Sequence, residues 1–213
     1  KGVLGISMRG CPLTTEKQDL LSIVASRVNK VLANATLHRD TKMLALTDGL
    51  TGLLNHRAFH ERIRHEFERY RRYGSFLSLI VVDFDNLKVF NDTYGHPVGD
   101  EVLRELGDIL RDTSRESDVL ARYGGDEFVI LLPQTNAGNA VKMAERIREK
   151  VEKHYFIVQN LNLQSTISIG VATVPEEGID SPHDLLERAD RALYEAKRSG
   201  KNRTVVSVPH LLA

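Results

Sequence analysis

Two glycines and two acidic residues stand side by side in the segment Gly124-Gly125-Asp126-Glu127. Runs typical of β-strands flank it, at 118–123 and 128–132, so the segment is predicted to form the tip of a β-hairpin. Glycine has no Cβ, which lets a ligand approach the backbone closely. Adjacent carboxylates repel each other unless a cation or water surrounds them. The tip therefore predicts either a metal ion held against a phosphate or an ordinary solvated acidic turn.

A further acidic residue, Asp83, follows the apolar run 76–82, which is typical of a central strand buried on both faces. Side chains alternate along a strand, so Asp83 and Asp85 should leave on one face and Phe84 on the other. If this strand neighbours the hairpin, Asp83 and Asp126 converge. A few carboxylates together with substrate phosphates suit Mg²⁺, and two such ions can activate a hydroxyl and stabilise a leaving phosphate.

Three lysines, Lys88, Lys197 and Lys201, could neutralise a triphosphate. The last two also lie near a predicted helix end, where a positive charge suits the macrodipole, so their role stays open. Asn91 and Asp100 are candidates for reading a base, because a carboxylate accepts from guanine N–H groups and an amide donates to guanine acceptors. Asp100 could instead cap the following helix.

The composition is that of a soluble globular protein, with 213 residues, 41% hydrophobic and 27% charged. The net charge of zero predicts no nucleic-acid partner and no direct contact with an anionic membrane. The single Cys11 excludes an internal disulfide and favours a reducing, cytoplasmic location. No run reaches the ~20 apolar residues of a membrane helix, and there is no signal peptide. Because the chain begins inside a strand-like run, we expect a piece of a longer protein.

The first ten residues read as a short strand, and Thr15 and Gln18 fit a capping box for a long helix. An apolar stripe with three- and four-residue spacing follows it: Leu20, Leu21, Val24, Val28, Val31 and Ala35. This helix either packs on its own domain or forms a parallel two-stranded connector between protomers. A turn-rich segment, 48–53, is predicted to be a hinge at a domain boundary.

Beyond the hinge, helices and strands alternate. We expect a helix at 56–73 between Asn55 and Gly74, a strand at 76–82, a short helix at 86–92, a turn at 94–99, a helix from Asp100 or Glu101, the hairpin, a helix from Asn136 to 153, strands at 155–158 and 165–174, a helix from Ser181 to near Gly200, and a strand at 204–208. The order predicts an α/β (α+β), ferredoxin-like β-α-β-β-α-β sheet with helices on one side.

Several motifs in this order resemble those of GGDEF-domain diguanylate cyclases. They are Arg122–Phe128, Asp48–Asn55, Asp83–Lys88, Asn91–His96, Gly99–Asp100, Ser168–Val171 and Ala189–Lys197. The resemblance runs from about 48 to 203 and implies a nucleotidyl-cyclase or palm-type sheet. Over a shorter stretch, residues 1–35 resemble the last strand and the C-terminal helix of a GAF sensor domain. The predicted domains are therefore 1–46, the end of a GAF-like sensor with its connector, and 47–213, the GGDEF domain.

The resemblance implies condensation of two GTP into cyclic di-GMP and two pyrophosphates, with two Mg²⁺ or Mn²⁺ ions per site. It assigns the metal to Asp83, the Phe84 carbonyl and Asp126; catalysis to Asp126, Glu127 and Lys88; and the nucleotide to Asn86, Leu87, Asn91, His96, Asp100, Lys197 and Lys201. Two positions depart from the family pattern. Leu87 replaces a common Phe, and Lys201 replaces Arg, which keeps the charge but loses the bidentate fork.

Arg115 and Asp118 match the Arg-x-x-Asp site of the family, where product binds and inhibits, and Arg146 could add a second arginine. The alternative is a salt bridge within the loop. The product is two-fold symmetric and each chain has one site, so the resemblance implies a homodimer, controlled by the upstream sensor in the same polypeptide. Rival interpretations are a non-catalytic cyclic di-GMP receptor, a palm-type polymerase and a scaffold module.

Overall fold

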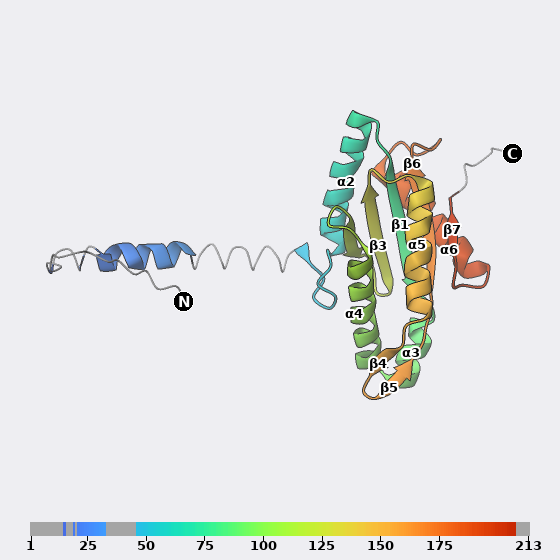
Figure 1. Ribbon diagram of the computed structural model, residues 1–213, viewed down its shortest axis with the longest axis horizontal. Helices are drawn as coiled ribbons and strands as arrows, with labels where there is room; N and C mark the ends of the chain where they lie inside the picture. Colours follow the sequence, from blue (N-terminus) through green and yellow to red (C-terminus); the bar gives the residue numbers. More distant parts are fainter. Residues whose placement is uncertain (1–14, 16–18, 20, 33–45, 208–213) are drawn as a thin grey trace. The chain divides into compact units, whose positions relative to one another are not determined.

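The computed structural model describes residues 15, 19, 21–32 and 46–207 (Figure 1). The chain divides into two compact units, 1–45 and 46–213. Residues 21–32 of the first unit are helical, and Val24, Val28 and Val31 are exposed along this helix. The predicted N-terminal strand, Gln18 of the capping box, and Leu20 and Ala35 of the apolar stripe lie outside the described residues.

A five-stranded sheet forms the centre of the second unit, in the order β2-β3-β1-β6-β7 (Figure 1). The strands are β1 (Leu77–Phe84), β2 (Val119–Arg122), β3 (Glu127–Pro133), β6 (Ile167–Val174) and β7 (Thr204–Val206). The central strand β1 is antiparallel to both β3 and β6, and only β7 is parallel to its neighbour, β6. The first four of these strands have the ferredoxin-like order, as predicted.

Helices cover both faces of this sheet. Apolar side chains of α4 (His96–Thr113) and α5 (Ala137–Glu152) pack on one face with Ile80 and Val82. Those of α2 (His56–Tyr73) and α6 (Pro182–Arg198) pack on the other with Leu79 and Val81. The prediction of helices on one side was therefore wrong for the sheet as a whole. β1 and β6 are buried at every position, which requires a covering layer on each face.

Side-chain caps fix where the helices begin. Asn55 accepts a hydrogen bond from the Ala58 N–H at 3.0 Å, and α2 ends at Gly74 with a left-handed φ of 65°. Asn136 and Ser181 cap α5 and α6 in the same manner. These boundaries confirm the predicted ones.

The sequence suggested a turn at 94–99, but the structure has helix on both sides of Gly95 in this segment. The short helix α3 (Leu87–Tyr94) ends at Gly95, whose φ is 88°, and α4 begins at once with His96 and with Pro97 in its first turn. Asp100 lies inside α4, so it does not cap this helix. Two short strands, β4 (Phe156–Val158) and β5 (Leu161–Leu163), pair only with each other, and β5 was not predicted. None of the helices in the described residues is long and apolar enough to cross a membrane.

Candidate active site

Three acidic residues, Asp83, Asp126 and Glu127, are neighbours where β1 ends beside the hairpin tip. Asp83 on β1 is in register with Glu127 on β3. The next residue, Phe84, donates its N–H to the Asp126 carbonyl at 3.1 Å, and its side chain is buried in the core. Asp83 and Asp126, the predicted metal pair, are 43 residues apart in the sequence. The register of the two antiparallel strands brings them close together.

Lys197 of α6 reaches this cluster, with its Nζ 2.7 Å from Asp83 Oδ2. Burial is the main reason that the pKa of Asp83 is raised to about 6. The hydrogen bond from Lys197 opposes this shift, and the charges of Asp126 and Glu127 add to it. Burial also raises the pKa of Glu127, with Asp190 and Asp126 adding to the effect of burial and Lys197 opposing it. One lysine thus faces several acids that disfavour one another's ionisation.

This donor set fits a divalent cation. All of the acidic donors are oxygens, which Mg²⁺ and Mn²⁺ prefer. Burial and the neighbouring acids together raise the pKa values of Asp83 and Glu127, and the charge of Lys197 offsets only part of this rise. A dication beside these carboxylates would supply the missing positive charge.

An arginine from the hairpin holds its tip in place. Arg122 donates from Nη2 and Nε to the Gly125 carbonyl, at 2.7 and 3.2 Å, and from Nη1 to Asp48 at 3.3 Å. Asp48 in turn accepts hydrogen bonds from the N–H and hydroxyl of Thr51. Although burial opposes it, the Thr51 hydrogen bonds and the charge of Arg122 keep the pKa of Asp48 below its ordinary value.

The predicted hinge at 48–53 is therefore an ordered turn that supports the hairpin. Leu54, which follows it, donates to the Leu120 carbonyl and accepts from the Arg122 N–H. Sequence reasoning missed Asp48 as a positioning residue. The available signal was the Asp at position 48 with Thr three residues later, a pattern typical of side-chain-closed turns.

A second buried acid, Asp85, organises the loop after α6. Its carboxylate accepts from the hydroxyls of Thr166 and Ser168, at 2.6 and 2.7 Å, and from the Asn202 N–H at 3.2 Å. Beside Asn202, the Lys201 Nζ donates to Asn86 Oδ1, just before α3. The structure thus places Asn86 and Lys201 together, on the loops that Asp85 joins. Leu87 is buried and begins α3, on which Lys88 is exposed.

The candidate base-reading residues lie where α3 meets α4. Asn91 Oδ1 is buried without a hydrogen-bond partner. Gly99 packs directly on it, and a Cβ at Gly99 would lie 1.9 Å from Asn91 Oδ1. Asp100 follows Gly99 and is exposed, as is His96 at the start of α4. The interface of the two helices therefore holds an amide with an unused acceptor next to an exposed carboxylate.

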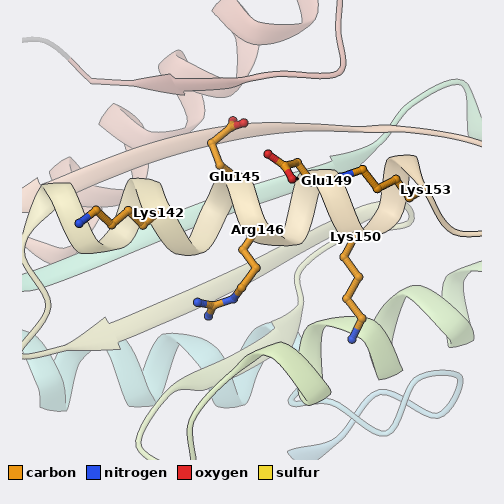
Figure 2. Close-up of a pocket in the computed structure, with 6 residues that line it drawn as sticks. All are labelled: Lys142, Glu145, Arg146, Glu149, Lys150 and Lys153. Carbon is orange, nitrogen blue, oxygen red and sulfur yellow. Dashed lines mark hydrogen bonds and ion pairs between the residues drawn. The ribbon is translucent and has the colours of Figure 1, made fainter.

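The predicted inhibitory residues gather at the turn after α4. The Arg115 N–H donates to Asp118 Oδ2 at 2.8 Å, and Arg146 Nη2 of α5 donates to the Thr113 carbonyl at 3.1 Å. Figure 2 shows Arg146 and Lys150 extending from one side of α5, where Lys150 approaches Asp112 of α4. In the part of the chain that the structure describes, Arg115 and Asp118 form no ion pair between their side chains, so the loop salt bridge is not observed.

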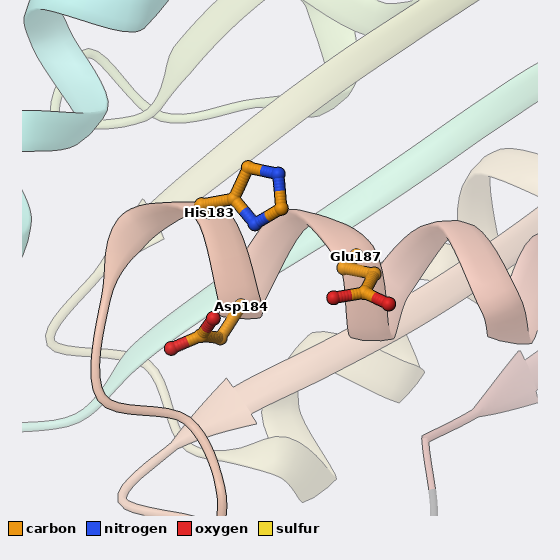
Figure 3. Close-up of side chains that lie close together, drawn as sticks. All are labelled: His183, Asp184 and Glu187. Atoms are coloured by element: carbon orange, nitrogen blue, oxygen red, sulfur yellow. The ribbon is translucent and has the colours of Figure 1, made fainter.

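A separate group of possible ligands lies at the start of α6 (Figure 3). Within the described residues, His183, Asp184 and Glu187 have ligand atoms within 4.8 Å of one another. However, the Asp184 carboxylate already accepts the Asp180 N–H at 3.0 Å. The positive end of the α6 dipole also disfavours a cation there, so we assign no metal to this group.

Comparisons with known proteins identify the family of this chain. The family of diguanylate cyclase GGDEF domains matches residues 45–203. The response regulator PleD of Caulobacter vibrioides is 44% identical over 164 residues, which cover 76% of this chain and 36% of PleD. The diguanylate cyclase DgcP of Pseudomonas aeruginosa is 39% identical over 191 residues, 88% of this chain and 28% of DgcP.

Among solved structures, the coiled coil and GGDEF domain of DgcB from Caulobacter crescentus, in complex with c-di-GMP, superposes with a TM-score of 0.81. It is 32% identical, and the match covers 88% of this chain and 98% of that one. The chain spans about a third of the length of PleD and DgcP. By its family match, its sequence and its fold, the chain belongs to the GGDEF-domain diguanylate cyclase family.

Proposed function

We propose that this chain is a diguanylate cyclase that condenses two GTP into cyclic di-GMP and two pyrophosphates. The observation that carries the proposal is the convergence of Asp83, Asp126 and Glu127 with Lys197 at one end of the sheet. Curated relatives named diguanylate cyclases support it, although this chain spans only part of their length. Incubation with GTP and Mg²⁺, with the products identified by mass, tests it.

Asp83, Asp126 and the Phe84 carbonyl would hold two Mg²⁺ or Mn²⁺ ions. Bound ions of this kind stabilise charge on transferring phosphates and make a hydroxyl easier to deprotonate. The acids themselves support this assignment, because burial, with a further contribution from Asp126 and Glu127, raises the pKa of Asp83 beyond what Lys197 offsets.

The positive charges around the cluster would bind the triphosphate. Lys197 keeps its charge, because the Asp83 hydrogen bond and charge raise its pKa against the effect of burial. Lys88, Lys201 and the backbone amides of Asn86 and Leu87 add donors near the start of α3, where a helix N-terminus favours anions. Lys201 in place of Arg would make a single contact with phosphate where a fork would make two.

Asn91 and Asp100 would recognise guanine, with His96 near the nucleotide. The Asn91 amide would donate from Nδ2 to acceptors of guanine, while its Oδ1 packs against Gly99. The exposed Asp100 carboxylate would accept from N1–H and N2–H₂. An acid at this position favours guanine, which is why we propose GTP as the substrate of both half-reactions.

Each 3′-oxygen would attack the α-phosphorus of the other nucleotide, and the bond between the α- and β-phosphates would break to release pyrophosphate. The hydroxyl proton would leave toward Glu127, whose raised pKa makes its carboxylate a better acceptor than an ordinary glutamate. One chain positions one nucleotide, so two chains must face each other across a two-fold axis. Alignment of the two nucleotides then supplies most of the acceleration.

Specific activity should therefore fall when the protein is diluted below its dimerisation constant. Because the rate depends on paired half-sites, it should follow the dimer fraction measured by sedimentation at the same concentrations. A constant specific activity in a preparation shown to be monomeric would contradict the proposed two-chain site.

The N-terminal helix supplies a candidate connector for this pairing. Its exposed residues Val24, Val28 and Val31 follow the spacing of a coiled-coil stripe. The related DgcB fragment that contains a coiled coil covers 88% of this chain. We further propose that an upstream sensor in the same polypeptide acts through this helix. Its assignment to a GAF-like domain ending at 46 gains no support from the family match, which begins at residue 45.

Arg115, Asp118 and Arg146 would bind cyclic di-GMP as an inhibitor. The turn that Asp118 closes leaves the Arg115 side chain exposed, and Arg146 is anchored beside it through the Thr113 carbonyl. Two guanidinium groups can pair with phosphates and guanine acceptors of one ligand. DgcB has been solved with c-di-GMP, which supports binding of this ligand by the family.

The Arg115→Ala variant should keep its initial rate and lose product inhibition, with the inhibition constant for added cyclic di-GMP rising by about tenfold or more. Initial-rate measurements with and without added product check this. Arg104→Ala is a matched control, because Arg104 is an exposed α4 arginine paired with Glu101. Equal inhibition of Arg115→Ala and this control would show that product binds elsewhere.

A non-catalytic cyclic di-GMP receptor is the second candidate. It shares the residues at the α4 turn but has no use for Asp83, Asp126 and Glu127 together. The retention of this complete cluster, with Lys197 in contact, favours the cyclase.

A further inference from the structure

Two histidines on α2 direct the same ring nitrogen toward each other. His56 and His60 are four residues apart, so they lie on one face of the helix, and their Nε2 atoms are 3.2 Å apart. Two imidazole nitrogens bound to one tetrahedral ion, each at about 2.0–2.1 Å, are about 3.3 Å apart. The pair therefore already has the separation of a two-histidine chelate.

A phenol oxygen from the hairpin lies beside this pair. Tyr123 Oη is 3.1 Å from His60 Nε2, and the Tyr123 ring packs 4.5 Å from the His56 ring and 5.6 Å from the His60 ring, centroid to centroid. Phe59 packs edge-on against both Tyr123 and His60. These ring contacts restrict the rotamers of the donors, which is the support that ligands of a metal site need.

The electrostatic surroundings are mixed. The N-terminus of α2, Arg64 and His183 of α6 disfavour a cation, although the Arg64 Nε is bonded to the His60 carbonyl. Asp190 and Glu127 act in the opposite direction, since their charges add to the effect of burial in raising the pKa of the Tyr123 phenol. Acidic charge from α6 and β3 is therefore available near Tyr123, whose ring packs against both histidines.

We propose that His56 and His60 bind one late transition-metal dication of the Zn²⁺ or Ni²⁺ class through both Nε2 atoms. Imidazole nitrogens select such ions, whereas the oxygen donors around Asp83 suit Mg²⁺, so the two sites differ in preference. Water fills the remaining positions, next to Tyr123. Tyr123 directly precedes Gly124, so an ion held here lies beside the start of the catalytic hairpin's tip. The site does not depend on cyclase activity.

The test is a titration of the tag-free protein with Ni²⁺ in saturating Mg²⁺, followed by calorimetry, together with the visible absorption spectrum of Co²⁺. Wild type should bind one ion, and His56→Ala or His60→Ala should weaken binding by about tenfold or more, because each removes a ligand. His65→Ala, an exposed histidine on the same helix, should bind like wild type. Thermal unfolding of each variant establishes that it is folded.

The proposal fails if His56→Ala and His60→Ala bind Ni²⁺ as tightly as His65→Ala does. It also fails if wild type gives no Co²⁺ spectrum, or if Asp126→Asn, and not His60→Ala, removes that spectrum. In those cases the 3.2 Å contact is only a hydrogen bond between two imidazoles. None of these measurements depends on turnover of GTP. A failure of the metal-site proposal can therefore be distinguished from a failure of the proposed cyclase activity.

Discussion

Replacing Asp83 by Asn is expected to abolish cyclic di-GMP formation and, at the same time, to make the protein more stable at neutral pH. The loss of turnover should be about 10³-fold or more, because the variant removes a carboxylate that we propose holds the catalytic metal ions. A purely structural residue would lose activity and stability together. The opposite signs are therefore a signature of a carboxylate retained for chemistry.

The gain in stability follows from the pKa of Asp83, which is raised from 3.8 to about 6 in the folded protein. This group does not affect stability well below pH 3.8, where it is protonated in both the folded and the unfolded state, and its ionisation destabilises the fold as pH rises from about 4 through 6. A shift of this size corresponds to up to about 3 kcal/mol above pH 6. The raised pKa of Asp83 already includes the opposing hydrogen bond and charge of Lys197.

Urea unfolding in metal-free buffer at about pH 3 and at pH 7.5 measures this difference. The free energy of unfolding of the variant should exceed that of wild type at the higher pH and equal it at the lower pH. Asp92→Asn, an exposed acid on α3, is the control and should change stability at neither pH. An Asp83→Asn variant that is less stable than wild type at pH 7.5 would show that the buried, ionised Asp83 carboxylate does not destabilise the fold.

Gly170→Ala is expected to destabilise the domain by at least about 3 kcal/mol. A Cβ on Gly170 would lie 2.1 Å from the Ala189 carbonyl oxygen and 2.3 Å from the Leu193 nitrogen, both backbone atoms of α6. Relief requires α6 to move away from β6, and α6 carries Lys197. Both stability and activity should therefore fall.

Chemical denaturation and far-ultraviolet circular dichroism check this prediction. Gly138→Ala provides the comparison, because a Cβ there approaches no atom closer than 3.7 Å and the residue lies in α5. That variant should be as stable as wild type or slightly more so. Equal stability of the two variants would mean that α6 does not pack on β6 as described.

Local signals in the sequence predicted most of the elements. Asn55, Asn136 and Ser181 each cap a helix through their own side chains, and the apolar run before Asp83 is a central strand. Such features depend on residues three or four positions apart, which a sequence displays directly. The start of α4 was missed because a Gly–His–Pro sequence also reads as a turn, and only Gly95 and the packing on α3 decide between them.

Contacts between distant residues could not be predicted from one sequence. Arg122 and Asp48 are 74 residues apart, and Asp85 and Asn202 are 117 apart. Nothing local distinguishes these side chains from exposed acids and bases. The close packing of Gly99 on Asn91 likewise depends on the angle between two helices. Convergence of Asp83 and Asp126 was predictable only through the expected strand order.

The most direct test of the proposed activity is to incubate the chain with GTP and Mg²⁺, at a concentration where sedimentation shows a dimer, and to identify the products by mass. Cyclic di-GMP should form with two pyrophosphates per molecule, and Asp126→Asn should form none while remaining folded and dimeric. A dimer that binds cyclic di-GMP but converts no GTP, or an Asp126→Asn variant as active as wild type, would contradict the proposal.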